Sequence, residues 1–333
     1  KYLIECIDTG WISSEGPFVE KLEHGMCELT GREHAFAVCN GSAALELAVK
    51  AIGIQPGDEV IMPTFTIISC ALAVIRAGAV PVYVDSDLET WNMQMDGIEN
   101  LINPKTKAIM AVHIYGITVD MDPLLKIAKK YNLKVIEDAA EVIGQTYKGR
   151  QCGSFGDIST FSFYPNKHVT TGEGGMVLTN DPQIAEKCKS MRNLCFGKKN
   201  RFEHETIGWN FRMSNLQAAV GVAQLERITE TLKKKSAVGQ MYRYFLKEND
   251  NIQLPLGKTS YCENIFWIFG IISLQKNNNA QWWMDKLKKD DIGTRPFFYP
   301  MHLQTTLKYA QKLDCSYKNS EFLSNFGFYL PSS

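Results

Sequence analysis

The sequence of 333 residues lacks several features that would each indicate a class of protein. It has no net charge, because 36 basic side chains balance 36 acidic ones, so its overall electrostatics give no sign of a nucleic-acid partner or of an anionic membrane surface. It has no apolar run long enough to span a bilayer, and its first residues do not resemble a signal peptide. We therefore expect a cytoplasmic protein without a membrane partner.

The sequence also lacks any pattern that would pair its nine cysteines. They are scattered, odd in number and never form a Cys-x-x-Cys pair, which favours reduced thiols over disulfides. A zinc site needs closely spaced ligands, and the nearest approximation, His24 with Cys27, has no second pair. We expect no metal.

What is present is an alternation of short apolar runs with helical stretches from residue 35 to about 195. The runs are apolar on both faces, which predicts a mainly parallel sheet covered by helices on both sides, that is, an α/β fold. The predicted strands are 35–39, 59–63, 80–85, 108–115, 134–139, 159–164 and 175–180. The predicted helices between the early strands are 42–53, 67–78 and 122–132.

The last third of the chain has a different character. A long helical pattern runs from Ser214 to Glu248, followed by a strand-like run at 264–274, a helix at 279–291 and an extended segment at 294–300. This order, in a chain long enough for two units, predicts a large domain over residues 1–230 and a smaller C-terminal α+β domain over residues 231–333.

The glycine-rich run "TGEGG" at 171–175 suggests a nucleotide loop. A dinucleotide fingerprint, however, lies between a strand and a helix, whereas these glycines lead into the strand-like "MVLTN". No Gly-Lys-Ser/Thr sequence indicates a phosphate loop of the Walker type either. The sequence favours a turn between two strands, and a nicotinamide dehydrogenase is disfavoured.

Three other stretches carry candidate chemistry. Gly41 and Ser42 open a helix after a strand, where backbone N–H groups and a hydroxyl can bind an anion; the alternative is that Ser42 only caps the helix. Asp138 ends a buried strand, where it is either a cap or a partner for a ligand. Lys167 follows a later strand among aromatic residues, and burial would lower the pKa of its amine and make it nucleophilic.

Together these three stretches supply the parts that hold pyridoxal 5′-phosphate. The helix start anchors the phosphate, and Asp138 keeps the ring nitrogen protonated so that the ring can accept electrons. Lys167 forms the Schiff base and later moves a proton. The combination predicts an enzyme that uses this cofactor.

The segments "VCNGSAALELAVKAIG", "VIEDAAE", "GSFGDISTFSFYPNKHVTTGEGGMVLTN" and "GWNFRMSNLQAAVG" resemble the DegT/DnrJ/EryC1/StrS aminotransferases, and the resemblance covers nearly the whole chain. It implies the fold type I architecture, with a mostly parallel sheet and a smaller C-terminal α+β domain. It also implies that Asn210 reaches the phosphate in a neighbouring subunit, so the protein is expected to be a homodimer with shared active sites. The cofactor-binding residues implied are Gly41, Ser42, Ala43, Ile67, Asp138, Glu141, Ser162, Lys167 and Asn210.

Two positions depart from the family pattern. Glu141 stands where many members have Gln beside the cofactor hydroxyl, and Ile67 stands where relatives often place an aromatic side chain over the ring, a place that Phe65 could take instead. One branch of the family replaces the lysine with histidine and dehydrates sugars. Here the position is Lys167 and His168 is its neighbour, which favours transamination.

The segments "EDAAE" and "TRPFFYPMHLQ" are most similar to the perosamine-synthase-like branch. This resemblance implies L-glutamate as the amino donor and a nucleotide sugar, GDP-4-keto-6-deoxy-D-mannose, as the ketone. Alternatives are another nucleotide-linked keto-sugar, a cyclitol, a small phosphorylated ketone, or a regulatory protein that kept the fold without catalysis. The candidate substrate-binding residues, for each of which packing is an alternative role, are His113, Tyr115, Arg295, Phe298 and His302.

Overall fold

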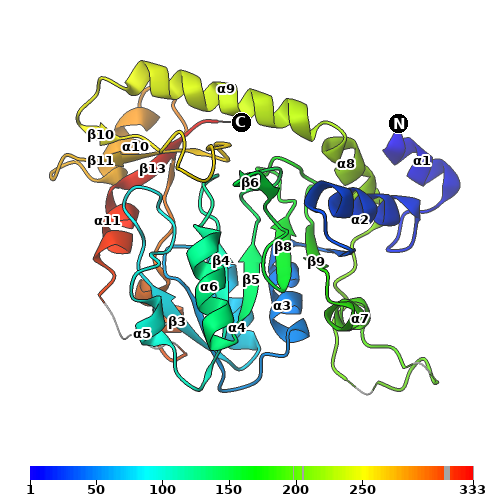
Figure 1. Cartoon of the computed structure of the whole chain (residues 1–333). Coiled ribbons are helices and arrows are strands. Elements are labelled where there is room, and N and C mark those ends of the chain that lie inside the picture. Colours follow the sequence, from blue (N-terminus) through cyan, green and yellow to red (C-terminus); the bar gives the residue numbers. More distant parts are fainter. Residues whose placement is uncertain (198, 205, 311–315, 333) are drawn as a thin grey trace.

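The computed structural model describes residues 1–197, 199–204, 206–310 and 316–332. Figure 1 shows a large central sheet and a second, smaller sheet, with the long helix α9 (Ile228–Leu246) running across the top of the molecule above both. The chain therefore has the predicted α/β architecture with a smaller C-terminal α+β part.

The large sheet has seven strands in the order β1-β9-β8-β5-β4-β2-β3. All neighbouring pairs between β8 and β3 are parallel, whereas β9 runs antiparallel to both β1 and β8. The sheet is thus mostly parallel, as expected. Its strands are β1 (His34–Val38), β2 (Glu59–Pro63), β3 (Val80–Val84), β4 (Thr106–Val112), β5 (Lys134–Asp138), β8 (Ile158–Ser162) and β9 (Gly175–Thr179).

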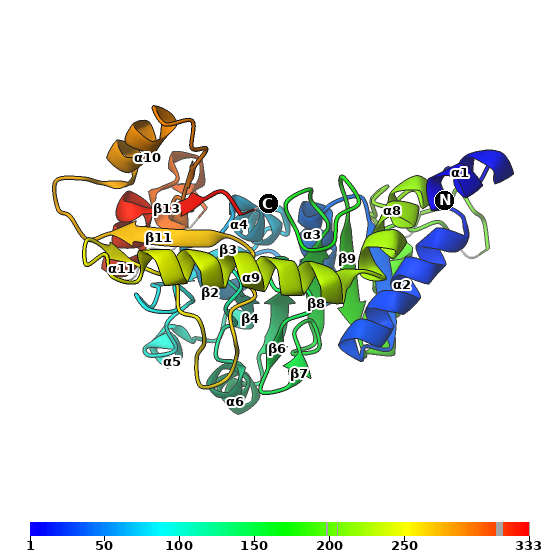
Figure 2. The ribbon, with the colours of Figure 1, turned by 90° about the horizontal axis from the view of Figure 1, so that it is seen from above.

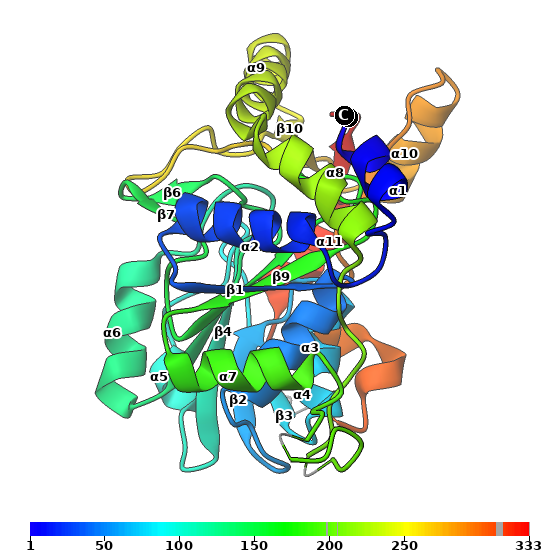
Figure 3. The same cartoon turned by 90° about the vertical axis from the view of Figure 1, so that its right-hand side faces the viewer.

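Helices cover both faces of this sheet because its strands are apolar on both faces. One face packs against α3 (Gly41–Ala51), α4 (Ile68–Arg76) and α7 (Pro182–Met191). The other packs against α2 (Pro17–Thr30) and α6 (Met121–Tyr131). Figure 3 shows α2 and α7 on opposite sides of β1 and β9. Residues that alternate along a strand therefore face different helical layers.

The predicted helix at 214–248 is wrong as a single element. The structure has α8 (Asn215–Leu225), which begins with a capping box between Ser214 and Gln217, and then α9. Arg227 has φ −109° and ψ 10° at the break, which is outside the helical region. Since α8 packs along α2 and the helix α1 (Tyr2–Thr9), while α9 leaves toward the second sheet (Figure 2), one straight helix could not make both contacts.

The second sheet is antiparallel, with the strand order β10-β11-β13-β12. It consists of β10 (Ile252–Gln253), β11 (Phe269–Ser273), β12 (Arg295–Pro296) and β13 (Gly327–Leu330). Ile272 of β11, with Trp267 and Phe297 from the segments next to its strands, continues the core on the α3 and α4 face of the large sheet. The two sheets therefore share one apolar core, which fixes the second sheet beside the carboxyl ends of the parallel strands.

The remaining described elements are short or peripheral. They are α5 (Ile98–Leu101), the hairpin of β6 (Thr146–Tyr147) and β7 (Arg150–Gln151), α10 (Ala280–Lys288), α11 (Lys318–Phe326) and the 3₁₀ turns Met301–Leu303 and Thr305–Leu307. In the part of the chain that the structure describes, no helix combines the length and the hydropathy needed to cross a bilayer.

Candidate active site

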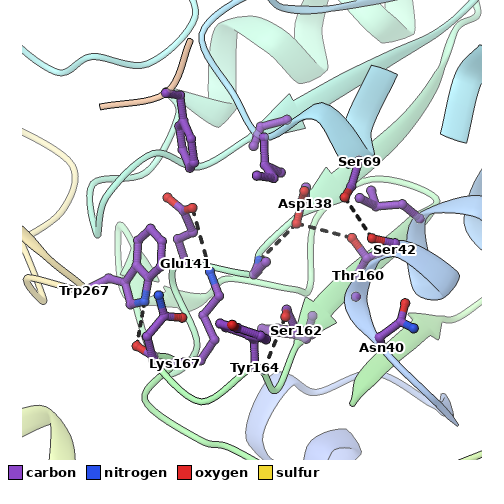
Figure 4. A pocket seen from close by; sticks show the side chains of 18 of the residues that line it. Asn40, Ser42, Ser69, Asp138, Glu141, Thr160, Ser162, Tyr164, Lys167 and Trp267 are labelled. Carbon is purple, nitrogen blue, oxygen red and sulfur yellow. Dashed lines mark hydrogen bonds and ion pairs between the residues drawn. The ribbon is translucent and has the colours of Figure 1, made fainter. Parts of the chain in front are cut away.

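A cavity of about 560 Å³ lies where the parallel strands of the large sheet end and the second sheet begins. Figure 4 shows that its walls come from the starts of α3 and α4, the ends of β5 and β8, and the connection that follows β8. The C-terminal third of the chain closes the other side with Trp267, Phe298 and Tyr329. This is the edge at which open α/β sheets bind ligands.

The anion-binding end of the cavity is the N-terminus of α3. Asn40 caps this helix, since its side chain accepts a hydrogen bond of 2.8 Å from the backbone N–H of Ala43. The cap is therefore Asn40 and not Ser42, whose hydroxyl lies 2.8 Å from Ser69 Oγ instead. Gly41 and Ser42 line the cavity, whereas Ala43 is buried and its N–H is already engaged.

Gly41 and Ser162 form the floor of this anion-binding end. A Cβ atom on Gly41 would lie 2.8 Å from Ser162 Cβ, so only glycine allows the helix start to approach the end of β8 so closely. Ser162 lies opposite Gly175 in the antiparallel ladder. The hydroxyls of Ser42 and Ser162 and the dipole of α3 thus converge on one region, which suits a phosphate group.

Asp138, the last residue of β5, lies in the cavity wall and is almost completely buried. Its Oδ1 accepts a hydrogen bond of 3.1 Å from the N–H of Ala140 and a longer one of 3.4 Å from Thr160 Oγ1. Cys70 Sγ donates to Oδ2 over 3.3 Å. Burial raises the pKa of this carboxyl group, and the hydrogen bonds oppose that shift.

Lys167 lies in the connection 163–174, which returns the chain to the same edge of the sheet because β9 is antiparallel to β8. Its side chain is only 9% exposed. The amine lies 3.7 Å from Glu141 Oε1 and 3.6 Å from the centre of the Trp267 ring. Burial lowers the pKa of the amine, while Glu141 and Asp138 raise it by a smaller amount. The amine therefore faces the cavity as a partly desolvated base.

Glu141 is the second buried carboxyl group of the cavity. Its Oε2 accepts a hydrogen bond of 2.8 Å from the N–H of Tyr115, and its Oε1 faces Lys167. Burial raises the pKa of Glu141 to about 7, with Lys167 opposing the shift. The group can therefore gain or lose a proton near neutral pH.

The glycine-rich run 171–175 shapes the turn before β9. Gly172 has φ +81°, a left-handed conformation that favours glycine. A Cβ on Gly175 would lie 2.5 Å from the carbonyl oxygen of Asn40, so this glycine lets β9 pass close to the start of α3. The structure agrees with the prediction of a turn between two strands.

Several candidate residues do not line the cavity. His113 is fully buried on the other face of the sheet, where its ring lies 3.1 Å from Glu137 Oε1. Val112 faces the cavity, and alternation along β4 turns the next side chain, His113, away. His302 lies between Thr64 and Glu321. Neither placement supports direct contact with a substrate.

Tyr115 and Arg295 lie behind or beside the cavity wall. Tyr115 is buried with φ +55°, and its hydroxyl accepts a hydrogen bond of 3.1 Å from the N–H of Phe298, which does line the cavity. Arg295 is exposed and lies opposite Tyr329 in the sheet register. These residues are placed to support Phe298 and Tyr329.

Ile67 and Asn210 have separate placements. Ile67 lines the cavity and is 44% exposed, whereas Phe65 is completely buried against Tyr115 and Phe298 and does not line it. The aliphatic side chain is thus the one available to cover a ligand. Asn210 is exposed outside the cavity, in an isolated bridge with Asn193.

Ser69 and Trp267, which line the cavity, and Cys70, which contacts Asp138 in its wall, are among the residues that were not singled out from the sequence. Ser69 and Cys70 lie in an apolar helical stretch, and Trp267 lies in a strand-like apolar run, so each has the pattern of a core residue. The indole of Trp267 also donates a hydrogen bond of 2.8 Å to the carbonyl of Asn166, next to Lys167. Only the tertiary contacts distinguish these residues from their neighbours.

The donor set of the cavity fits pyridoxal 5′-phosphate. Lys167 is the only basic side chain among the described residues that line it, so the phosphate site consists of helix N–H groups and hydroxyls. Asp138 offers a carboxylate to a ring nitrogen, and Lys167 offers an amine to an aldehyde carbon. Both belong to one cavity, which has room for the cofactor.

The comparisons with known proteins agree with this chemistry. The DegT/DnrJ/EryC1/StrS aminotransferase family matches residues 1–333. The chain is 42% identical to the GDP-perosamine synthase of Caulobacter vibrioides and 41% identical to that of Escherichia coli O157:H7, covering 99% and 100% of this chain and 89% of each relative. DesV of S. venezuelae, solved in complex with a ketimine intermediate, superimposes with a TM-score of 0.92 at 30% identity, covering 99% of this chain and 88% of DesV.

The fold and the cavity define an aminotransferase that depends on pyridoxal 5′-phosphate. The chain belongs to the DegT/DnrJ/EryC1/StrS aminotransferase family.

Proposed function

We propose that the protein transfers the amino group of L-glutamate to GDP-4-keto-6-deoxy-D-mannose and so forms GDP-perosamine. The observation that carries the chemistry is the buried amine of Lys167 in the same cavity as the carboxylate of Asp138. The choice of ketone is supported by the identity of 42% to a GDP-perosamine synthase across 99% of this chain.

Each cavity residue has a task in this proposal. Pyridoxal phosphate, when bound, supplies an aldehyde carbon and a ring that accepts electrons. Lys167 Nζ would hold the cofactor through its aldehyde carbon and would move a proton at the substrate carbon, a task for which burial favours its neutral form. Asp138 would hold the proton on the ring nitrogen. Gly41, Ser42 and Ser162 hold the phosphate.

Glu141 is proposed to hold the proton at the cofactor's ring hydroxyl. Its pKa of about 7 lets the side chain donate a hydrogen bond when protonated, which the ionised form cannot do. Tyr115 orients it through the backbone N–H that binds Oε2. Ile67 covers the ring from the start of α4.

Phe298 and Tyr329 are proposed to contact the sugar, because they line the cavity opposite the parallel strands. Arg295 interacts with the Tyr329 side chain at the edge of the second sheet and is exposed, a position that suits pairing of its guanidinium with a substrate phosphate. A panel of ketones assayed with L-glutamate tests this choice. Turnover of a small phosphorylated ketone or a cyclitol, without turnover of GDP-4-keto-6-deoxy-D-mannose, contradicts the proposed substrate.

Borohydride reduction followed by peptide mass mapping tests the covalent chemistry. We expect a pyridoxyl group on the peptide that contains Lys167 and on no other peptide. Protein that shows neither cofactor absorbance nor this adduct would instead be the regulatory protein without catalysis.

A homodimer with shared active sites is part of the proposal. Asn210 is exposed and outside the cavity of its own chain, a position that suits contact with a second copy. The first helix and the segment after it also expose apolar side chains at one end of the molecule, near the start of α8 (Figure 1). These side chains are Leu3, Ile4, Ile7, Trp11 and Ile12.

Mixing two inactive variants tests the shared sites. In a heterodimer of Lys167→Ala and Asn210→Ala chains, one site carries both changes and the other carries neither. We expect activity to return when the two variants are unfolded, mixed and refolded together, but not when each is refolded alone. Sedimentation equilibrium of the parent protein gives the oligomeric state independently.

Two further statements remain proposals. The eight cysteines that the structure describes are free thiols, which suits a reducing compartment, and we place the enzyme in the cytoplasm. The division into domains at residues 1–230 and 231–333 is supported by the start of α9 at Ile228, from which the chain leaves the large sheet.

A further inference from the structure

The first turn of α4 contacts two ends of the cavity through consecutive side chains. Ser69 Oγ lies 2.8 Å from Ser42 Oγ at the start of α3 (Figure 4). Cys70 Sγ lies 3.3 Å from Asp138 Oδ2 at the end of β5. The first turn of α4 therefore connects the anion-binding end of the cavity to the carboxylate of Asp138.

Cys70 is placed as a hydrogen-bond donor. Its side chain has no exposure to solvent, and burial together with Asp138 raises the pKa of the thiol well above its usual value, so the sulfur keeps its proton. Thr66 lies just before α4, and its Oγ1 is 3.4 Å from the sulfur. Since Cys70 donates to Asp138, the hydroxyl of Thr66 donates to the sulfur, and a short chain of donors ends on the carboxylate.

The thiol supports one oxygen of Asp138 while other groups support the second. Ala140 N–H and Thr160 Oγ1 both donate to Oδ1, whereas Cys70 donates to Oδ2. A donor to the ionised form of a carboxyl group favours that form, and burial favours the protonated form. The contact with Cys70 therefore acts against the effect of burial.

We propose that Cys70 is a positioning residue that keeps Asp138 ionised and oriented, so that the shared proton stays on the ring nitrogen of the cofactor. The inference rests on the proposed function. A buried cysteine usually packs as a small apolar residue, and packing alone predicts no change in the proton affinity of the bound cofactor when the sulfur is replaced.

The test is a pH titration of the cofactor's visible absorbance in the holoenzyme. This absorbance changes when the link to Lys167 loses its proton, and a less positive ring holds that proton more tightly. We expect Cys70→Ala and Cys70→Val to raise the midpoint by about 0.5–1 pH unit, the size of one modest hydrogen bond. Cys70→Ser, with a stronger donor, should lower the midpoint below that of the parent protein.

Cys188→Ala is the matched control, because Cys188 is a fully buried cysteine on α7, outside the cavity. Its midpoint should equal that of the parent. The inference requires the midpoint to be lowest in Cys70→Ser, intermediate in the parent protein and highest in Cys70→Ala and Cys70→Val, and any other order overturns it. If the two apolar variants do not fold, the comparison of Cys70→Ser with the parent decides. If the parent protein binds the cofactor and the Cys70 variants have the same pH midpoint as the parent, only this inference is wrong. If the parent protein binds no cofactor, the proposed function is wrong as well.

Discussion

Glu137 and Asp138 are neighbours at the end of one strand, yet they face opposite sides of the sheet. Glu137 lies on the α6 side, with hydrogen bonds of 2.6 and 2.7 Å from the N–H groups of Gly153 and Phe155 and a third from His113. Asp138 lies on the α4 side and borders the cavity, and its three donors, the N–H of Ala140 and the side chains of Thr160 and Cys70, lie 3.1–3.4 Å away. The comparison shows that a carboxylate held by two short backbone hydrogen bonds away from the cavity supports the fold, whereas one held by longer hydrogen bonds at the cavity wall remains available for a ligand.

Lys167 and His168 are likewise neighbours of which only one faces the cavity. Lys167 faces the cavity with an amine beside Glu141. His168 is buried away from the cavity, and burial lowers its pKa to about 3, with Lys235 adding to the shift. In each of these two adjacent pairs one residue, Asp138 or Lys167, is assigned to catalysis and its neighbour, Glu137 or His168, to the stability of the fold. Substitutions can test each assignment.

The largest expected effect is on turnover in Lys167→Ala. The variant loses the covalent attachment and the group that moves the proton, so we expect turnover to fall by more than about 10⁴-fold. Steady-state assays with L-glutamate measure the loss. His168→Gln is the matched neighbour and should retain most of its turnover at pH 7.5, and comparable losses in both would break the comparison.

Asp138→Asn should lose turnover without losing stability. An amide cannot stabilise a protonated ring nitrogen as a carboxylate does, and we expect turnover to fall by about 10²- to 10³-fold. Because burial raises the pKa of Asp138, its charge does not stabilise the cofactor-free fold at neutral pH. Urea unfolding of the cofactor-free variant should therefore show a midpoint no lower than that of the parent.

Glu137→Gln should have the opposite pattern. The amide can accept from only one side, so it leaves one of the N–H groups of Gly153 and Phe155 without an acceptor in a buried place. We expect the free energy of unfolding to fall by about 2–4 kcal/mol. Turnover per folded molecule should stay close to that of the parent, and a specific loss of turnover would contradict the structural role.

The smallest effect is on the pH dependence of stability in His168→Gln. The unfolded chain binds a proton at this histidine below about pH 6.5, whereas the folded chain does so only near pH 3, so stability contributed by His168 falls as pH drops through this window. Urea unfolding between pH 4.5 and 6 should show a slope reduced by about 1.4 kcal/mol per pH unit in the variant. His24→Gln, at an exposed histidine, is the control substitution for this measurement.

The sequence was sufficient to predict the strands of the large sheet and the two residues that oppose each other across the cavity. Apolar runs and strand ends carry that information, because a parallel sheet is buried on both faces and binds ligands at one edge. The sequence pattern does not tell which of the two adjacent acids, Glu137 or Asp138, faces the cavity, because alternation along the strand fixes only that the two side chains lie on opposite faces of the sheet. Asp138 and Lys167 line one cavity in the structure, while His113, one strand away, faces the other side.

Other features depended on contacts between distant segments. Trp267 reaches Lys167 across 100 positions of the chain, and the break between α8 and α9 arises because α8 packs against α1 and α2 while α9 leaves toward the second sheet. Cys70 has the pattern of a core residue and acquires its role only through Asp138. Local periodicity contains none of this information.

The antiparallel direction of β9 has a consequence for how such a protein can change. The connection 163–174 leaves and re-enters the sheet at one edge, and both of its ends are fixed by the pairing of Ser162 with Gly175. A substitution at position 167, or an insertion in this connection, would change the reactive group without changing the order or the pairing of the strands. The connection that carries the catalytic lysine can therefore change in sequence while the paired strands stay the same, so that a new reaction can evolve there at little cost to folding.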